Sequence, residues 1–462
     1  MKSGLFFTIV FAILFAFPLA AQEQKKIDDL EARITALESR IQQLSQQQPE
    51  SAEIKEIQRQ IEILTEEIES MKVERKVPEA ETQQHGLGAA ASKVYRSSPG
   101  VSFGGYGEML YQNFSSSSAE AETDSLRAAE EEEEENSHRD SIDYLRAVLY
   151  TGYKFNDKVL FNSELEVEHA NTEKAGAVEM EFGYLDFLSR PALNVRAGMM
   201  LMPVGLINEL HEPTAYLGAK RPDVEQVIIP TTWSEIGAGL FGETGNISYR
   251  AYLVSGLDSE DFSAHGIREG RQHGSVAHAE DFALVGRLDY SPVEGMIFGG
   301  SIYSGNSAQG RTTPSGEPFD APVTLGELHA GARLRGVSLR ALWASGSVGD
   351  AAQVNLANGF TGEESIGKTF GGWYAEAGFD LASVLSLGAH SVTPYVRYES
   401  YDTQKSVPTG FVRDPENEVT TLTTGVAWKP IPQTVIKVDY QNRDDAENSG
   451  VDQFNIALGY IF

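Results

Sequence analysis

Hydrophobic and polar residues alternate with a period of two over most of the chain after residue 100. The clearest segment is the last one, where Phe454, Ile456, Leu458, Tyr460 and Phe462 alternate with small or polar residues. Successive side chains of an extended strand point to opposite faces, so each such segment predicts a strand with one apolar face. About sixteen segments share the pattern, near residues 101–111, 142–154, 158–169, 178–188, 193–201, 236–243, 246–255, 281–290, 296–303, 327–335, 337–345, 373–380, 392–401, 421–428, 435–443 and 452–462.

The connections between these segments alternate between short and long. Short ones such as 155–157 and 244–245 alternate with long ones such as 112–141 and 202–235. Short periplasmic turns and long outer loops are the arrangement of outer-membrane barrels, whereas a soluble sandwich has no reason to separate loops by length. The sequence therefore predicts, over residues 100–462, an all-β transmembrane barrel of about 16 antiparallel strands, which leaves an aqueous lumen.

The first hundred residues follow other patterns. Residues 1–21 combine an early lysine, an apolar stretch and small residues at the end, and predict a signal peptide. In 22–76 apolar residues recur at spacings of three and four, which indicates an α-helical coiled coil for oligomerisation. Its first block suits a dimer and its isoleucine-rich second block a trimer, while pairing of the two blocks within one chain is the alternative. Residues 77–99 contain Pro, Gly and Ala and predict a flexible linker.

The third long connection, 202–235, is too apolar and too rich in proline for an ordinary exposed loop. Loops of this length inside a compact fold are usually functional or disordered. We therefore predict that this third outer loop folds inward and narrows the pore, where opposed charges select permeants. The predicted constriction residues are Arg196, Asn208, Glu209, His211, Glu212, Lys220 and Arg221.

Charged side chains also fall on the predicted inner faces of the strands. The residues that we expect to line the lumen are of both signs: Arg146, Arg287, Arg333, Arg335, Arg397, Glu164 and Glu166. Among the constriction residues, Arg196, Lys220 and Arg221 are expected to form a cationic face opposite the carboxylates of the loop. A metal site at His211-Glu212 would need a third ligand, and the sequence offers none beside it.

Composition narrows the possible functions. A formal net charge of -30 at pH 7 argues against a nucleic-acid partner, because phosphate backbones are bound by clustered Lys and Arg. Without any cysteine, the chain has no disulfide framework and no thiolate metal site. It also lacks a phosphate-cradling glycine loop, a nucleophile elbow and a zinc-binding histidine pair. We therefore expect no enzymatic activity, no catalytic residue, no metal and no cofactor.

Several motifs within the barrel carry a resemblance to a known family. They are Gly104-Gly105-Tyr106-Gly107-Glu108, Tyr144-Leu145-Arg146, Tyr153-Lys154-Phe155, Glu164-Leu165-Glu166, and Val195-Arg196-Ala197-Gly198-Met199 leading into Pro203-Val204-Gly205. With them, most of 101–462 resembles the phosphate-selective O and P type porin family. The resemblance implies sixteen strands, trimers, and anion passage through a Lys- and Arg-rich lumen.

These patterns together predict an outer-membrane porin. We expect the barrel to lie in the lipid of the bacterial outer membrane, with the coiled coil in the periplasm and the chain as a homo-oligomer, a trimer by the resemblance. Its function would be passive diffusion of small hydrophilic solutes such as phosphate or small organic anions. Two alternatives remain: a structural anchor that tethers the envelope through the coiled coil, and a gated uptake channel for a specific ligand.

Overall fold

The computed structural model describes residues 30, 32–41, 56–61, 63–65, 83–115, 139–170, 172, 176–385, 387–388 and 390–462. The predicted signal peptide, most of the predicted coiled coil and the acidic part of the first outer loop lie outside these residues. Described residues 32–41 and 56–61 are helical, and oligomerisation through this region remains a prediction. No described helix has the length and apolar character needed to cross a membrane.

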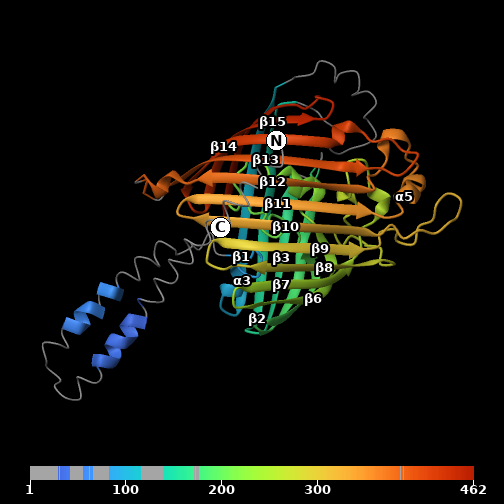
Figure 1. Ribbon diagram of the computed structural model, residues 1–462. Helices are drawn as coiled ribbons and strands as arrows, with labels where there is room; N and C mark the ends of the chain where they lie inside the picture. The colour runs from blue at the N-terminus through green and yellow to red at the C-terminus, as the bar shows by residue number, and fades with distance from the viewer. Residues whose placement is uncertain are drawn as a thin grey trace.

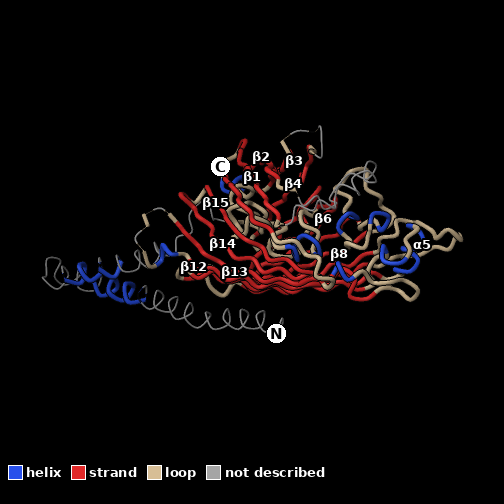
Figure 2. Tube along the Cα trace, turned by 90° about the horizontal axis from the view of Figure 1, so that it is seen from above, coloured by secondary structure: helices blue, strands red, loops and turns tan. Residues whose placement is uncertain are grey.

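Residues 100–461 form a closed antiparallel barrel of sixteen strands (Figures 1 and 2), which confirms the predicted fold. Each strand pairs with its neighbours in sequence, and β1 closes the ring against β16, from Tyr106 opposite Ile461 to Phe114 opposite Gln453. The strands are β1 (Gly100–Phe114), β2 (Ser141–Asn156), β3 (Val159–Glu168), β4 (Val178–Arg190), β5 (Leu193–Leu201), β6 (Ser234–Thr244), β7 (Ile247–Ser255), β8 (Phe282–Tyr290), β9 (Met296–Gly305), β10 (Val323–Leu334), β11 (Val337–Val348), β12 (Thr369–Phe379), β13 (Ser391–Ser406), β14 (Glu418–Ile431), β15 (Thr434–Asp445) and β16 (Gln453–Ile461).

The two faces of the wall have the reverse of the usual polarity. In β10, Leu328 points outward and is 62% exposed, while its neighbours Glu327 and His329 point inward and are 2% and 5% exposed. Charged residues are almost never fully buried in soluble proteins unless they are paired, and large apolar side chains avoid water. An apolar exterior around a polar interior is the arrangement of a transmembrane barrel, whose outer face lies against lipid.

Short helical elements lie in the connections. The outer loops carry η2 (Val224–Ile228), η3 (Ser259–Asp261), η4 (Arg268–Gly270), α5 (Ala351–Asn358), η5 (Gly362–Glu364) and η7 (Pro415–Asn417), and η6 (Leu381–Ser383) lies between β12 and β13. The helix α3 (Lys93–Arg96) lies directly before β1.

Two segments occupy the interior of the barrel. One is the connection between β5 and β6, residues 202–233, which contains η2; the other is residues 84–97, which contain α3. Most side chains in both are buried. The composition of 77–99 predicts a flexible linker, but the structure packs residues 84–97 against the inner wall, because long-range polar contacts described below hold them there.

Candidate functional site

The loop 202–233 is closed at its base by the side chain of Asn208. The Asn208 amide nitrogen donates to the carbonyl oxygens of Met202 (2.7 Å) and Trp233 (2.9 Å), and its oxygen accepts the Trp233 backbone N–H at 2.7 Å. An asparagine amide that both donates and accepts hydrogen bonds in this way ties the two ends of the loop together. Asn208 therefore holds the point where the loop leaves the wall.

Glu225 holds the two halves of the loop together. One carboxylate oxygen accepts the backbone N–H groups of Leu206 (2.7 Å) and Ile207 (2.6 Å), and the other accepts the Tyr374 hydroxyl of β12 at 2.5 Å. Burial raises the pKa of Glu225 above its usual value. The side chain is fully buried, so these three donors are satisfied inside the barrel, as buried polar groups must be.

The loop crosses the whole lumen. Starting between β5 and β6, it reaches β13, which is eight strands away around the ring, where the backbone N–H of Val224 donates to Glu399 at 3.3 Å. On the side of the ring between β5 and β13, the Tyr216 hydroxyl donates to Glu108 of β1 at 2.7 Å, and the Ala219 N–H donates to Asp439 of β15 at 2.6 Å. A bridge across the full diameter narrows the route through the barrel.

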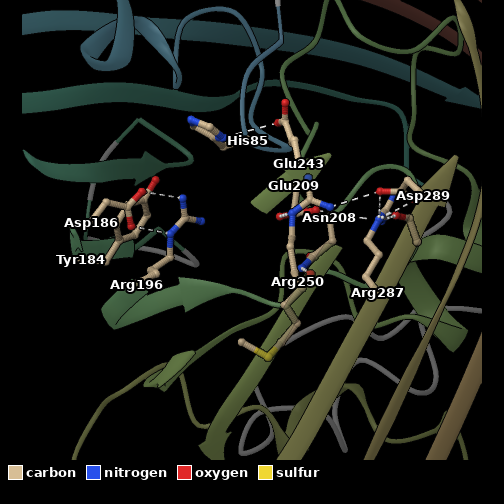
Figure 3. Close-up of polar contacts among 12 residues, drawn as sticks. His85, Tyr184, Asp186, Arg196, Asn208, Glu209, Glu243, Arg250, Arg287 and Asp289 are labelled. Carbon is tan, nitrogen blue, oxygen red and sulfur yellow. Dashed lines mark hydrogen bonds and ion pairs between the residues drawn. The ribbon is translucent and has the colours of Figure 1, made fainter. Parts of the chain in front are cut away.

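Glu209 lies beside a cluster of opposite charges on β7 and β8 (Figure 3). Its carboxylate is 3.1 Å from Arg250 Nε and 4.0 Å from Arg287 Nη1. Both arginines also reach Asp289, at 3.2 Å from Arg250 and 2.8 Å from Arg287. Asp289 in turn is 2.9 Å from the His329 ring. The loop and the wall therefore share one continuous network of alternating charges.

His211 and Glu212 face different partners. His211 Nδ1 donates to the Asn208 carbonyl at 2.9 Å, and Nε2 is 3.1 Å from the carboxylate of Glu164. Burial, with help from the charge of Arg221, lowers the pKa of His211 to about 4. Glu212 accepts the backbone N–H groups of residues 90 and 91, and burial raises its pKa.

The structure does not bring the expected cationic face together. Arg196 Nε donates to Asp186 at 2.9 Å and its guanidinium lies 3.9 Å from the centre of the Tyr184 ring, on the wall that contacts residues 84–97 (Figure 3). Lys220 lies near β13, where its carbonyl accepts Arg397 Nη1 at 3.4 Å. The Arg221 side chain is buried, and its Nε has no hydrogen-bond partner among the described residues.

Five of the predicted lumen-lining residues point into the barrel. Arg146 lies 3.5 Å from Glu108 and 3.4 Å from Glu166, and Arg397 lies 2.9 Å from Glu399. Glu164, Glu166 and Arg287 are buried on the same inner face.

The prediction for Arg335 is wrong, and Arg333, which by alternation shares the face of Glu327 and His329, lies at the exposed end of its strand. Both side chains are exposed, because Arg333 stands near the end of β10 and Arg335 lies in the turn that follows. Arg335 and Gly336 both have positive φ angles, 50° and 79°, the conformation of a two-residue type I′ turn. Alternation of inner and outer faces does not extend into a turn, so these arginines lie at the short-turn rim.

Comparison with known proteins places the chain in a family. An uncharacterized protein of Aquifex aeolicus is 34% identical over 403 residues, which cover 85% of this chain and 87% of that protein. The chain belongs to the family of this protein. No family model matches the sequence.

Solved structures similar to the chain include several outer-membrane barrels. OmpF of Salmonella typhi, in complex with daunomycin, is 11% identical, with 78% of this chain and 97% of that chain covered and a TM-score of 0.49. The outer-membrane channel DcaP of Acinetobacter baumannii is 11% identical, with 78% and 97% covered and a TM-score of 0.47. The trimer form of OmpT of Vibrio cholerae is 10% identical, with 79% and 100% covered and a TM-score of 0.47.

Several charged atoms in the lumen have no protein hydrogen-bond partner. Among the described residues, these include both carboxylate oxygens of Glu166, the ammonium of Lys437 and Nη2 of Arg397. The Lys437 ammonium lies 3.5 Å from the centre of the Tyr216 ring. A buried charge without a hydrogen-bond partner is costly, and water or a passing ion is the usual remedy. The lumen is therefore built for hydrated contents.

Sequence reasoning missed residues 84–97 and their partners on the wall. The Tyr95 hydroxyl donates to Asp186 at 2.6 Å and accepts from Arg196 Nη2 at 2.9 Å. Asn162 Nδ2 donates to the Ala91 carbonyl at 2.9 Å. Local periodicity gives no information on contacts between residues 71 to 101 positions apart. The one available signal was the contrast between Leu87, Val94 and Tyr95 and an otherwise small and polar segment.

Proposed function

We propose that the chain is a passive diffusion channel of the outer membrane for small hydrophilic, charged solutes. The observation that carries this is the reversed polarity of the barrel: charged side chains with unsatisfied atoms line the interior, while apolar side chains cover the exterior. A polar lumen enclosed by lipid-facing strands provides a hydrated path across a bilayer. Association of several copies, with trimers as the expected form, belongs to the same proposal.

The fixed charge of the lumen favours cations. Among the described residues, twelve carboxylates are fully buried on the strands, against five Lys and Arg side chains, while Arg146 and Arg340 are partly buried on the inner face. The carboxylates are Glu108, Glu164, Glu166, Glu181, Asp186, Glu235, Asp289, Glu327, Glu376, Glu399, Asp402 and Asp439, and the bases are Arg196, Arg250, Arg287, Arg397 and Lys437. Net negative charge within a low-dielectric wall concentrates cations and repels anions. Phosphate and small organic anions, which the resemblance implies, are therefore the second candidate.

The test is single-channel recording of the purified protein in a planar bilayer, with the reversal potential measured under a KCl gradient. We expect conductance steps and a potential whose sign reports K⁺ passage. The double variant Asp289→Asn/Glu327→Gln should shift the potential toward the anion side, while Arg333→Gln at the exposed rim should leave it unchanged. A potential of the opposite sign would favour the phosphate-type candidate. Correctly folded protein that never conducts would overturn the channel proposal.

A further inference from the structure

Residues 84–97, hereafter the plug, lie at the end of the barrel that carries the short turns. His85 is 3.5 Å from Glu243, which stands next to the β6–β7 turn, and Lys154, near the β2–β3 turn, donates to the Ser97 carbonyl at 3.2 Å. Figure 1 shows α3 at the same end as the C-terminus. The plug therefore sits in one mouth of the channel.

The plug fits this mouth closely. A Cβ on Gly88 would lie 2.4 Å from the Glu212 carboxyl carbon, and a Cβ on Gly86 would lie 2.1 Å from Arg250 Nη2. Residues 87–92 are buried. Gly86 also has a φ of +87°, a backbone conformation that favours glycine. The plug is therefore closely packed in the mouth of the channel.

Specific polar groups hold the plug to two parts of the channel. On the wall, the Asp186–Arg196 pair binds the Tyr95 hydroxyl. On the inward loop, one oxygen of Glu212 accepts the N–H groups of Ala90 and Ala91 at 2.9 and 3.0 Å. Because Glu212 follows His211, which contacts β3, the plug and the loop form one connected obstruction.

The attachment is of a kind that can be reversed. The plug adds no strand to the barrel sheet, and its larger apolar anchors are Leu87, Val94 and Tyr95. It joins β1 through residues 98 and 99, directly at the mouth. Beside it a cavity of about 350 Å³, lined among others by Gln83, Glu209 and Arg250, leaves space at the same end. Its withdrawal through the mouth would break no strand pair of the barrel.

We propose that the plug closes the short-turn end of the channel and opens it by withdrawing through that mouth, with the Tyr95 contact as its latch. The proposal rests on the channel function proposed above. The plug follows the N-terminal helical region in the sequence, so a change in that region could move the plug and control the passage of solutes.

A disulfide tests whether the plug must move. The chain has no cysteine of its own, and a Cβ on Gly152 of β2 would lie 2.6 Å from Val94 Cβ. Disulfides need Cβ atoms roughly 3.5–4.5 Å apart, so a small outward shift accommodates Val94→Cys with Gly152→Cys. The bond is formed after folding in the full chain and verified by the loss of free thiols. We expect openings in the reduced protein, their loss on oxidation, and their return with reductant; Val94→Cys alone should not respond.

Tyr95→Phe tests the latch without a cross-link. It removes only the hydroxyl and leaves Asp186 and Arg196 paired with each other. Loss of a hydrogen bond to a charged group should raise the ratio of open to closed time by about tenfold to a hundredfold. Tyr290→Phe, at an exposed tyrosine of β8, is the matched control and should leave this ratio unchanged.

The outcomes separate the two proposals. Equal conductance in oxidised and reduced protein, with an unchanged ratio in Tyr95→Phe, would overturn the plug and leave the channel standing. Absence of conductance from every folded form, including reduced protein and Tyr95→Phe, would overturn the channel and the plug with it. Loss of openings only on oxidation, together with more openings in Tyr95→Phe, supports both.

Discussion

Glu225 gives the sharpest test of what keeps the inward loop in place. Its carboxylate accepts two backbone N–H groups and one tyrosine hydroxyl inside the barrel. Burial raises its pKa, so the docked loop favours the neutral acid relative to an undocked loop in water. We therefore expect the charge itself to contribute little to docking, and the acceptor atoms to contribute most of it.

Two substitutions separate these contributions. Glu225→Gln keeps an oxygen for the N–H groups of Leu206 and Ile207 and should change the free energy of docking by less than about 1 kcal/mol. Glu225→Ala leaves both N–H groups buried and unsatisfied, which costs about 1–3 kcal/mol for each group. The sum is about 2–6 kcal/mol, so the undocked population should rise at least about 30-fold.

Trypsin reports this population directly. Lys220 lies in the loop and is followed by Arg221, so the bond after Lys220 is a cleavage site that becomes accessible only when the loop leaves the lumen. In folded protein in detergent, Glu225→Ala should be cut there at least about 30 times faster than the parent, and Glu225→Gln at nearly the parent rate. Equal cleavage rates of the two variants would refute the reasoning. If both were cut fast, the charge would hold the loop, and if both were cut at the parent rate, Glu225 would not hold it.

Two further predictions concern pH and the lipid face. Burial lowers the pKa of His211 from 6.5 to about 4, so its contribution to the free energy of docking, up to about 3 kcal/mol, is present above pH 6.5 and is lost as the pH falls toward 4. The rate of trypsin cleavage should therefore depend less on pH in His211→Gln than in the parent. Identical pH profiles of the two proteins would contradict this. On the outside, Leu328→Arg in the middle of β10 should destabilise the barrel by about 2–4 kcal/mol and Val337→Arg at the short-turn end by about 0–1 kcal/mol in urea unfolding from lipid vesicles. Equal losses would show that the outer face does not lie in lipid.

The comparison with His211→Gln is needed because Glu212 and Glu225 titrate in the opposite sense. Burial raises the pKa of both, so the docked loop takes up protons more readily at these carboxylates, and acid strengthens docking through them. Only the difference between the parent and His211→Gln isolates the histidine.

The local pattern was sufficient to predict the wall of the barrel. Alternation along β10 assigns Leu328 and His329 to opposite faces, because the side-chain period of a strand is fixed by its geometry. The same logic failed at Arg335, where the chain leaves the strand and enters a turn with positive φ. Face assignment from sequence is therefore reliable only within the strands.

The interior could be predicted only in part. The apolar and proline-rich character of 202–235 indicated a loop with something to pack against, but not which wall each charge meets. Arg196 pairs with Asp186 and not with the neighbours expected for it, and Tyr95 reaches a partner 91 residues away. Such contacts depend on the closed ring, which brings distant strands together, and no periodicity encodes them.

The closure of the ring between β1 and β16 has a consequence for aggregation. The strand that completes the cylinder, Gln453–Ile461, pairs with β1 on one side and β15 on the other. Without it, β1 and β15 would each present an unpaired row of backbone donors and acceptors, which is a template for pairing with other chains. A variant that lacks this strand would keep both edges open, so β16 protects the protein from aggregation as well as completing its wall.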